Sequence, residues 1–211
     1  SQRAIAVDHI EKIYKRYKKR SASNEELASH IGRQETVAQV FRQILSTTSK
    51  KNDPSRILLF GAFGNGNMGD VYQAMAVRAH LKKYWGLADD SIFSCSLLNS
   101  ALYPFPPGNI LPPESIFNYE LINSFDCLVV GGGGLLAHPH DPLSDAEWTR
   151  CIDIPIILLS LGASSSKVDG HARLLENSLI VSGRDSESLK ALRSHRVDSK
   201  LIPDPILSVD N

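Results

Sequence analysis

Long hydrophobic runs are absent from this chain of 211 residues. Its longest apolar stretches, such as residues 154–159, fall far short of the roughly 20 apolar residues that a membrane-spanning helix needs. Cysteine is scarce too, because Cys95, Cys127 and Cys151 are odd in number and form no CxxC pair, which argues against a disulfide framework or a zinc site. Basic residues near the amino terminus also leave no room for the apolar core of a signal peptide. These absences predict reduced, buried thiols and a cytoplasmic location.

Net charge is absent as well, since 23 Lys and Arg balance 23 Asp and Glu, and this neutral total gives no reason to expect a nucleic-acid partner. The balance hides an asymmetry. Residues 1–53 hold 11 basic and 6 acidic side chains, whereas residues 54–211 hold 12 and 17. The change predicts two regions, a basic helical extension over residues 1–53 and an α/β domain over residues 54–211.

The extension has apolar side chains at helical spacing. One stripe comprises Ile10, Ile13, Tyr14 and Tyr17, and a second comprises Val37, Val40, Phe41, Ile44 and Leu45. Ser23 and Glu26 are spaced as a capping box that starts a helix. The basic helix around residues 12–20 either lies on an anionic membrane or packs against the neighbouring domain or another subunit.

From residue 56 onward, short apolar runs alternate with helix-like segments. The runs cover residues 57–60, 92–97, 127–130, 156–161, 179–181 and 200–202. The helix-like segments cover residues 70–84, 113–124, 144–151, 171–177 and 185–194, and the proline-rich residues 103–108 are expected to form a stiff loop. Unbroken apolar runs are typical of strands that are buried on both faces. The alternation of such runs with helix-like segments therefore predicts a doubly wound, mostly parallel, Rossmann-like sheet.

Turns whose residues could bind a ligand or take part in chemistry follow five of these runs. They are GAFGNGNMGD at residues 61–70, the tetraglycine at 131–134, LGASSS at 161–166, SGRD at 182–185 and PDP at 203–205. The carboxyl ends of parallel strands meet at one edge of a sheet, where the ligands of such folds bind. The turns together therefore predict a ligand cleft at that edge.

The first turn lacks the partners of two familiar phosphate loops. Residues 64–69 match GxGxxG between a strand and a helix, but no acidic residue follows the second strand to hold a ribose. Asp70 and Val71 stand where a nucleotide-hydrolysing P-loop needs Lys and Ser or Thr. Dinucleotide binding and NTP hydrolysis are therefore disfavoured. Asp70 either caps its helix, or acts in acid–base chemistry or orients an acceptor hydroxyl. Asn65 and Asn67 either bind sugar hydroxyls or shape the turn.

The stretches GAFGNGNMGD, LVVGGGGLL, ILLSLGAS, VSGRDSESLKAL and LIPDPIL, in this order, resemble the polysaccharide pyruvyl transferase family over about residues 56–207. The resemblance implies transfer of the enolpyruvyl unit of phosphoenolpyruvate to a sugar of a cell-surface polysaccharide precursor, usually as a cyclic ketal. It also implies a fold similar to GT-B glycosyltransferases, with two Rossmann-like domains. This sequence matches the first of these, so the second domain and its donor-binding Arg and His residues are expected to be absent from the chain.

The resemblance implies that Arg184 contacts the donor, since the corresponding arginine of the family motif does so; an ion pair with Asp185 or Asp204 is the alternative. The remaining site predictions follow from residue type and position. The catalytic residues are predicted to be Asp70 and His138, and the substrate-binding residues Asn65, Gly66, Asn67, Gly132, Gly133, Gly134, Ser164 and Arg184. No metal is expected, because His138 and His140 lack a third ligand, and no cofactor is expected besides phosphoenolpyruvate as the donor substrate.

Two other functions fit the same cleft. One is a glycosyltransferase-like domain that binds a nucleotide-sugar, and the other is a catalytically silent module that binds a partner or completes an oligomer through residues 1–53. For the transferase, the expected acceptor is a saccharide, free or lipid-linked, at the inner face of the membrane.

Overall fold

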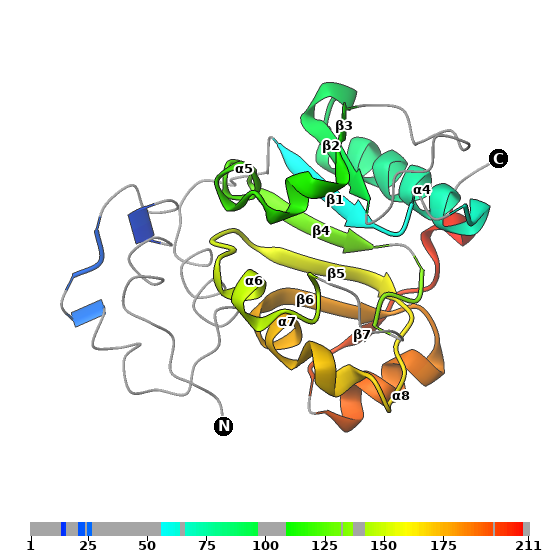
Figure 1. Cartoon of the computed structure of the whole chain (residues 1–211). Coiled ribbons are helices and arrows are strands. Elements are labelled where there is room, and N and C mark those ends of the chain that lie inside the picture. The colour runs from blue at the N-terminus through cyan, green and yellow to red at the C-terminus, as the bar shows by residue number, and fades with distance from the viewer. Residues whose placement is uncertain are drawn as a thin grey trace.

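A computed structural model describes residues 14–15, 21–23, 25–26, 56–63, 66–96, 109–131, 133–136, 142–195 and 197–208. Across this part of the chain, seven strands form one parallel sheet in the order β3-β2-β1-β4-β5-β6-β7 (Figure 1). The strands are β1 (Ile57–Gly61), β2 (Ile92–Ser96), β3 (Asn109–Leu111), β4 (Cys127–Gly131), β5 (Ile156–Leu161), β6 (Ser178–Gly183) and β7 (Lys200–Leu201). The predicted Rossmann-like parallel sheet is confirmed.

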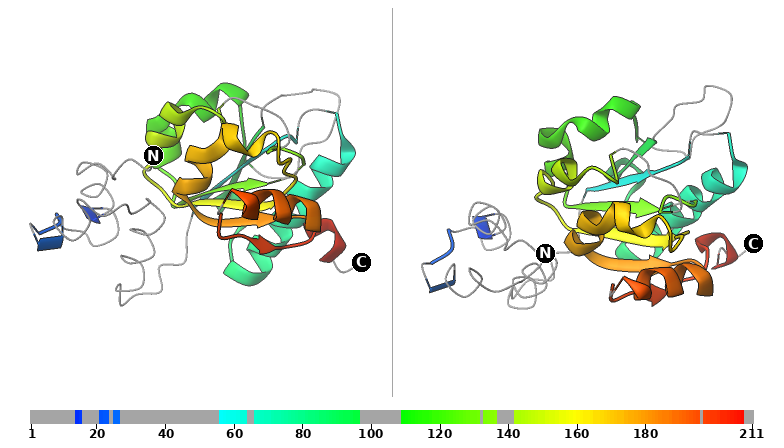
Figure 2. Two further views of the ribbon diagram at one scale, coloured as in Figure 1. Left: turned by 90° about the horizontal axis from the view of Figure 1, so that it is seen from below. Right: turned by 60° about the horizontal axis from the view of Figure 1, so that its bottom comes forward.

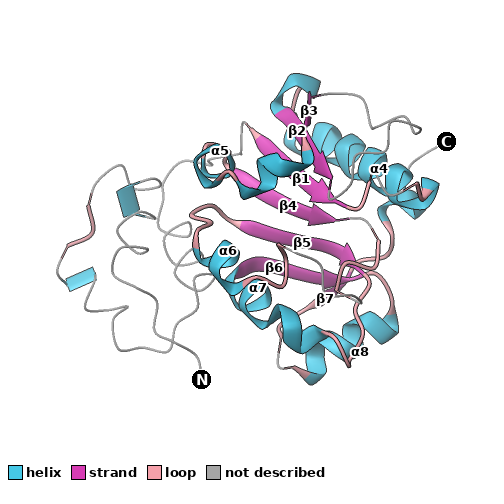
Figure 3. Ribbon diagram, in the orientation of Figure 1, coloured by secondary structure: helices cyan, strands magenta, loops and turns pink. Residues whose placement is uncertain are grey.

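Helices lie on both faces of the sheet (Figures 2 and 3). The α-helices are α4 (Met68–Trp85), α5 (Tyr119–Asn123), α6 (Ala146–Arg150), α7 (Ala172–Asn177) and α8 (Ser186–Ser194). The 3-10 helices are η1 (Asp89–Ser91), η2 (Pro113–Phe117), η3 (Val168–His171) and η4 (Pro205–Ser208). Helix α4 packs on one face, and α5 to α8 pack on the other.

The alternation of side chains along each strand divides the core into two layers. In β1, Leu58 and Phe60 belong to the cluster that contains Trp148 of α6, whereas Ile57 and Leu59 belong to the cluster with α4. All five side chains are at most 1% exposed. Each stabilises the fold by about 1.5–3 kcal/mol through burial, so both faces of β1 hold the helices in place.

Two elements differ from the sequence prediction. The edge strand β3 was not predicted, because a run of three residues next to a proline-rich segment carries too little apolar pattern. The single helix predicted over residues 113–124 is instead η2 followed by α5. Asn118 separates them, since it has extended backbone angles and its side chain accepts a hydrogen bond from Leu121 N at 3.0 Å.

Other predictions from the sequence hold. Ser23 N donates to Glu26 Oε2 at 2.8 Å and Glu26 N donates to Ser23 Oγ at 3.2 Å, which confirms the capping box. Of the three thiols predicted to be buried, Cys151 is only half-buried, whereas Cys95 and Cys127 are buried free thiols in β2 and β4. Burial raises the pKa of each to about 12, so both stay protonated at neutral pH.

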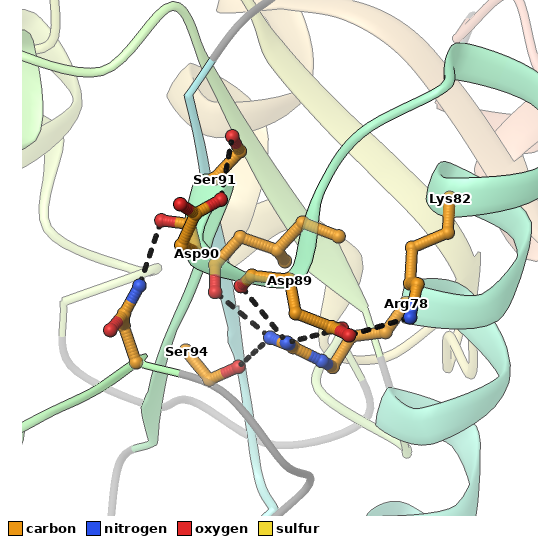
Figure 4. A network of polar contacts seen from close by, with 8 residues as sticks. Arg78, Lys82, Asp89, Asp90, Ser91 and Ser94 are labelled. Atoms are coloured by element: carbon orange, nitrogen blue, oxygen red, sulfur yellow. Dashed lines mark hydrogen bonds and ion pairs between the residues drawn. The ribbon is translucent and has the colours of Figure 1, made fainter.

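A buried arginine joins α4 to the start of β2 (Figure 4). Arg78 is 3% exposed, and its Nη1 donates to the backbone oxygen of Ile92 at 2.9 Å. Its Nη2 contacts both the backbone oxygen and the carboxylate of Asp89. Lys82 also pairs with Asp89, at 2.6 Å, and this hydrogen bond is the main reason that the pKa of Asp89 lies below its usual value. The network therefore has a buried arm at Arg78 and an exposed arm at Lys82.

We expect Arg78→Met to lower the free energy of unfolding by about 1–3 kcal/mol, because it keeps the apolar volume but leaves the buried oxygen of Ile92 without its donor. The matched variant Lys82→Met removes the exposed arm and should cost about 0–1 kcal/mol. Urea titration of both variants checks the difference. If both variants lost the same free energy of unfolding, the buried hydrogen bond from Arg78 to the backbone oxygen of Ile92 would contribute no more than the exposed ion pair of Lys82.

Candidate functional site

The order of the strands reverses between β1 and β4. Strand β2 lies on one side of β1 and β4 lies on the other, both parallel to it. The arrowheads of these strands point toward the side of the molecule where η4 lies beside the start of α4 (Figure 1). In open α/β sheets, the crevice beyond such a reversal is where ligands bind, so the turns after β1 and β4 are the first place to look for a site.

The turn after β1 ends in the cap of α4. Asn67 is the N-cap, and its side-chain oxygen accepts a hydrogen bond from Gly69 N at 3.0 Å. Gly66 precedes it with φ at 89°, a conformation that favours glycine. Asp70 lies inside the first turn and is 6% exposed. Of the alternatives weighed from the sequence, the cap is therefore Asn67 and not Asp70, and the side chain of Asn67 does shape the turn.

The turn after β4 packs directly on Asp70. Gly133 has φ at 79°, and a methyl group on its Cα would lie 2.6 Å from Oδ1 of Asp70. Its backbone N–H donates to Oε1 of Gln73, and its carbonyl accepts from Gly162 N at 3.1 Å. The amide that we assigned to the substrate at Gly133 thus already has a partner within the protein. Gly134, which follows it, is half-buried.

Arg184 packs on Gly162, which also contacts that turn. Its backbone N–H donates to Leu161 O at 3.2 Å, which continues the β5–β6 pairing beyond the end of the strands. A methyl group on Gly162 would come within 3.1 Å of Cζ of Arg184 and 3.0 Å of Cα of Gly134. The absence of a side chain at Gly162 therefore lets both the guanidinium and the glycine turn pack on this residue. The Arg184 side chain is 39% exposed.

Asp185 fixes this arginine from the α8 side. It is the N-cap of α8, and its Oδ1 accepts from Ser188 N at 2.7 Å. Its Oδ2 lies 3.3 Å from Nε of Arg184. The pKa of Asp185 is lowered, first by the hydrogen bond from the backbone of Ser188 and further by Arg184. The ion pair that we weighed against donor binding thus forms with Asp185, and it uses Nε instead of the two terminal nitrogens.

A bulge in β5 sets the direction of the chain just before Gly162. Ser160 has φ at 53° and is 1% exposed, and the register with β6 shifts between Leu158 and Leu161. Ser182 Oγ accepts from Ser160 N at 2.9 Å, so the irregular backbone keeps its hydrogen bond. Bulges of this kind often re-aim a chain beside a functional site.

Ser164 lies two residues beyond Gly162, at the same edge. Its carbonyl accepts from Lys167 N at 2.9 Å, and its Oγ lies 3.1 Å from Ser166 Oγ. The structure thus gathers Gly66, Asn67, Asp70, Gly133, Gly134, Ser164 and Arg184 at the carboxyl edge of the sheet. Asn65, Gly132 and His138 fall outside the described residues.

Two polar residues at this edge were not predicted as site residues. Gln73 is 4% exposed, and its Nε2 donates to Oδ2 of Asp204 in the segment after β7. The sequence predicted Asp204 only as an alternative ion-pair partner of Arg184. Gln73 lies three residues after Asp70 on the same face of α4, and a buried amide on that face is the signal that identifies it.

Among the described residues, no group of three or more His, Cys, Asp or Glu is arranged to hold a metal ion. The pair His138 and His140 lies outside them. No helix in the described ranges is long and apolar enough to cross a membrane.

The family model for polysaccharide pyruvyl transferase matches residues 67–211 of this chain, from the cap of α4 to the last residue. The chain belongs to the polysaccharide pyruvyl transferase family. The match covers four of the five motif stretches on which we based the resemblance, together with the end of the first, so that assignment is confirmed. Every described residue gathered at the carboxyl edge except Gly66 falls within the match.

No curated protein matches the chain. Among solved structures, a D-2-hydroxyisocaproate dehydrogenase is similar, with 9% sequence identity and a TM-score of 0.38. The match covers 96% of this chain and 56% of the dehydrogenase. The assignment of the fold rests on the strand order and the parallel pairing themselves.

Proposed function

We propose that this member of the pyruvyl transferase family moves the pyruvyl unit of phosphoenolpyruvate to a sugar of a cell-surface polysaccharide precursor, free or lipid-linked. In such a reaction the methylene carbon of the donor gains a proton. One sugar hydroxyl then bonds to the neighbouring carbon and loses its proton, the bond from that carbon to the phosphate oxygen breaks, and phosphate leaves. The second hydroxyl takes the place of the phosphate and loses its proton in turn, so that a cyclic ketal results. Phosphoenolpyruvate is the donor substrate, and the proposal includes no other cofactor.

The observation that supports this proposal most directly is the position of Arg184 against the Gly134 turn. Phosphoenolpyruvate carries a carboxylate and a phosphate, and a guanidinium can bridge two oxygens of either group. Gly134 follows a tight glycine turn and brings the main chain next to the same guanidinium. A cation near half-buried glycine main chain at the carboxyl edge of a parallel sheet suits an anionic donor.

Asp70 is our proposed base or orienting group for the acceptor hydroxyl. It packs on Gly133, whereas Arg184 packs on Gly162, so the carboxylate and the cation contact different glycines at this edge. A carboxylate kept apart from the donor-binding cation can accept a proton or a hydrogen bond from a sugar hydroxyl. His138 remains our candidate for proton donation to the methylene carbon, and it lies outside the described residues.

The proposal is tested by incubating the protein with phosphoenolpyruvate and candidate acceptor glycans. We expect phosphate release that requires the acceptor, together with a glycan that gains the mass of the pyruvyl ketal. Tight binding of a nucleotide-sugar without any phosphate release would contradict the proposal and favour a glycosyltransferase-like binding domain.

Location at the cytoplasmic face of the membrane, through residues 1–53, belongs to the same proposal and is checked by vesicle co-sedimentation.

A further inference from the structure

The side chain of Gln73 connects two parts of the chain that are remote in sequence. Its Oε1 accepts the backbone N–H of Gly133, 60 residues away, and its Nε2 donates to Asp204, 131 residues away. The second oxygen of Asp204 accepts from Ile206 N at 3.1 Å. A continuous chain of hydrogen bonds therefore runs from the glycine turn after β4, through α4, to the segment after β7.

That segment is also tied to the sheet at two other points. Ile202 N donates to Gly183 O at 3.1 Å, and Ser160 Oγ, in the bulge of β5, donates to Pro203 O at 3.2 Å. Beyond these ties, η4 packs against α4. The segment leaving the sheet is thus held at the same edge as the turns of the candidate site.

The two ends of the Gln73 amide differ chemically, and each end has the partner that it needs. The carbonyl end meets a donor, and the NH₂ end meets a carboxylate. Gln73 is buried, so losing either partner leaves a polar atom unsatisfied in the interior. Gly133, with its left-handed backbone, is held by this contact, by the hydrogen bond from Gly162 N and by packing against Asp70.

We propose that Gln73 is a positioning residue, which fixes the Gly133–Gly134 turn and couples that turn to the segment after β7 through Asp204. The identity of the ligand at this turn rests on the function proposed above. The coupling of the turn to the segment after β7 does not depend on that function. Coupling between two sites is reciprocal. A ligand that orders the turn must therefore also order residues 203–208.

An exchange of donor and acceptor tests the link. Gln73→Glu keeps the shape of the side chain, but it places a carboxylate against that of Asp204, and the repulsion should push the side chain away and weaken its hydrogen bond from Gly133 N. Asp204→Asn has one acceptor oxygen where Asp204 has two, so it can accept from Gln73 or from Ile206 N but not from both, and its effect should be smaller than that of Gln73→Glu. In the double variant Q73E/D204N, the introduced amide donates to the introduced carboxylate, so the chain of hydrogen bonds is complete again.

The first readout is amide hydrogen exchange over residues 131–136, which requires no ligand. We expect Gln73→Glu to speed exchange at Gly133 about tenfold or more, and the double variant to return it to the level of Asp204→Asn. Unchanged exchange in Gln73→Glu, or a double variant that exchanges as fast as Gln73→Glu, would overturn the inference. If Gln73→Glu does not fold, recovery of folding in the double variant supports the link and continued misfolding overturns it.

The second readout adds phosphoenolpyruvate. We expect the ligand to slow exchange over residues 203–208 in the wild-type protein and in Q73E/D204N, and not in Gln73→Glu. Ligand binding that leaves these residues unaffected in the wild-type protein would overturn the coupling. If the wild-type protein binds no phosphoenolpyruvate, the proposed function fails, and the first readout still decides the role of Gln73.

Discussion

We expect Arg184→Ala to weaken the binding of phosphoenolpyruvate by about 1.5–3 kcal/mol, the range for a hydrogen bond to a charged group. This loss corresponds to roughly 10- to 150-fold in the dissociation constant. The reason is that Arg184 lies beside the Gly134 turn at the end of β6, with its Nε held by Asp185. Because a lysine cannot bridge two oxygens in one plane, Arg184→Lys should recover only part of the loss. Calorimetric titration of phosphoenolpyruvate measures both variants.

Arg173→Ala is the matched control. Its side chain is 38% exposed against 39% for Arg184, and it likewise pairs with a neighbouring carboxylate, that of Glu176 in α7. The control should change neither affinity nor stability by more than about 0.5 kcal/mol. If Arg184→Ala kept full affinity and instead lowered the thermal midpoint, the arginine would be structural and the donor site would lie elsewhere.

The second large effect is expected at Gly133. A left-handed backbone costs a residue with a side chain about 1–2 kcal/mol, and crowding in a packed site costs about 1–3 kcal/mol more. Gly133 carries both costs, because its φ is 79° and a methyl group would lie 2.6 Å from Asp70 Oδ1. We therefore expect Gly133→Ala to lower the free energy of unfolding by about 2–5 kcal/mol, measured by urea titration.

Two other glycines separate the contributions. Gly86 has φ at 66° with nothing within 4 Å of an added methyl group, so Gly86→Ala carries the backbone cost alone. Gly170 has neither a left-handed backbone nor a neighbour within 4 Å, and Gly170→Ala should be close to neutral. A Gly133→Ala variant no less stable than Gly86→Ala would mean that Asp70 moves aside freely, and its assigned position against the turn would be wrong.

The sheet could be predicted from the sequence because its strands are buried on both faces. Residues such as Leu58 and Leu59 point to opposite layers and both pack on helices, so β1 reads as an unbroken apolar run. The gathering of the glycine-rich turns at one edge followed from this, since the carboxyl ends of parallel strands share that edge. Strand β3 was missed because edge strands are short and only partly buried.

The contacts within the site could not be predicted, because they depend on distances between remote segments. Gly133 was correctly placed at the edge, but its partner Gln73 lies 60 residues earlier in the chain. The cap of α4 depends on backbone angles, and both Asn67 and Asp70 are good capping residues. Arg78 is another such case, since its buried role follows only from the packing of α4 on β2.

A crystal structure with phosphoenolpyruvate bound tests the central claim most directly. We predict that the carboxylate or phosphate of the ligand lies within hydrogen-bonding distance of the Arg184 guanidinium and of the backbone N–H of Gly134. A pocket of about 530 Å³ lies away from this edge, beside the residues that precede β4 and β5. Its lining residues are Tyr119, Glu120, Asn123, Arg150, Cys151 and Asp153. Phosphoenolpyruvate bound in that cavity, or absent from the carboxyl edge at saturating concentration, would contradict the account.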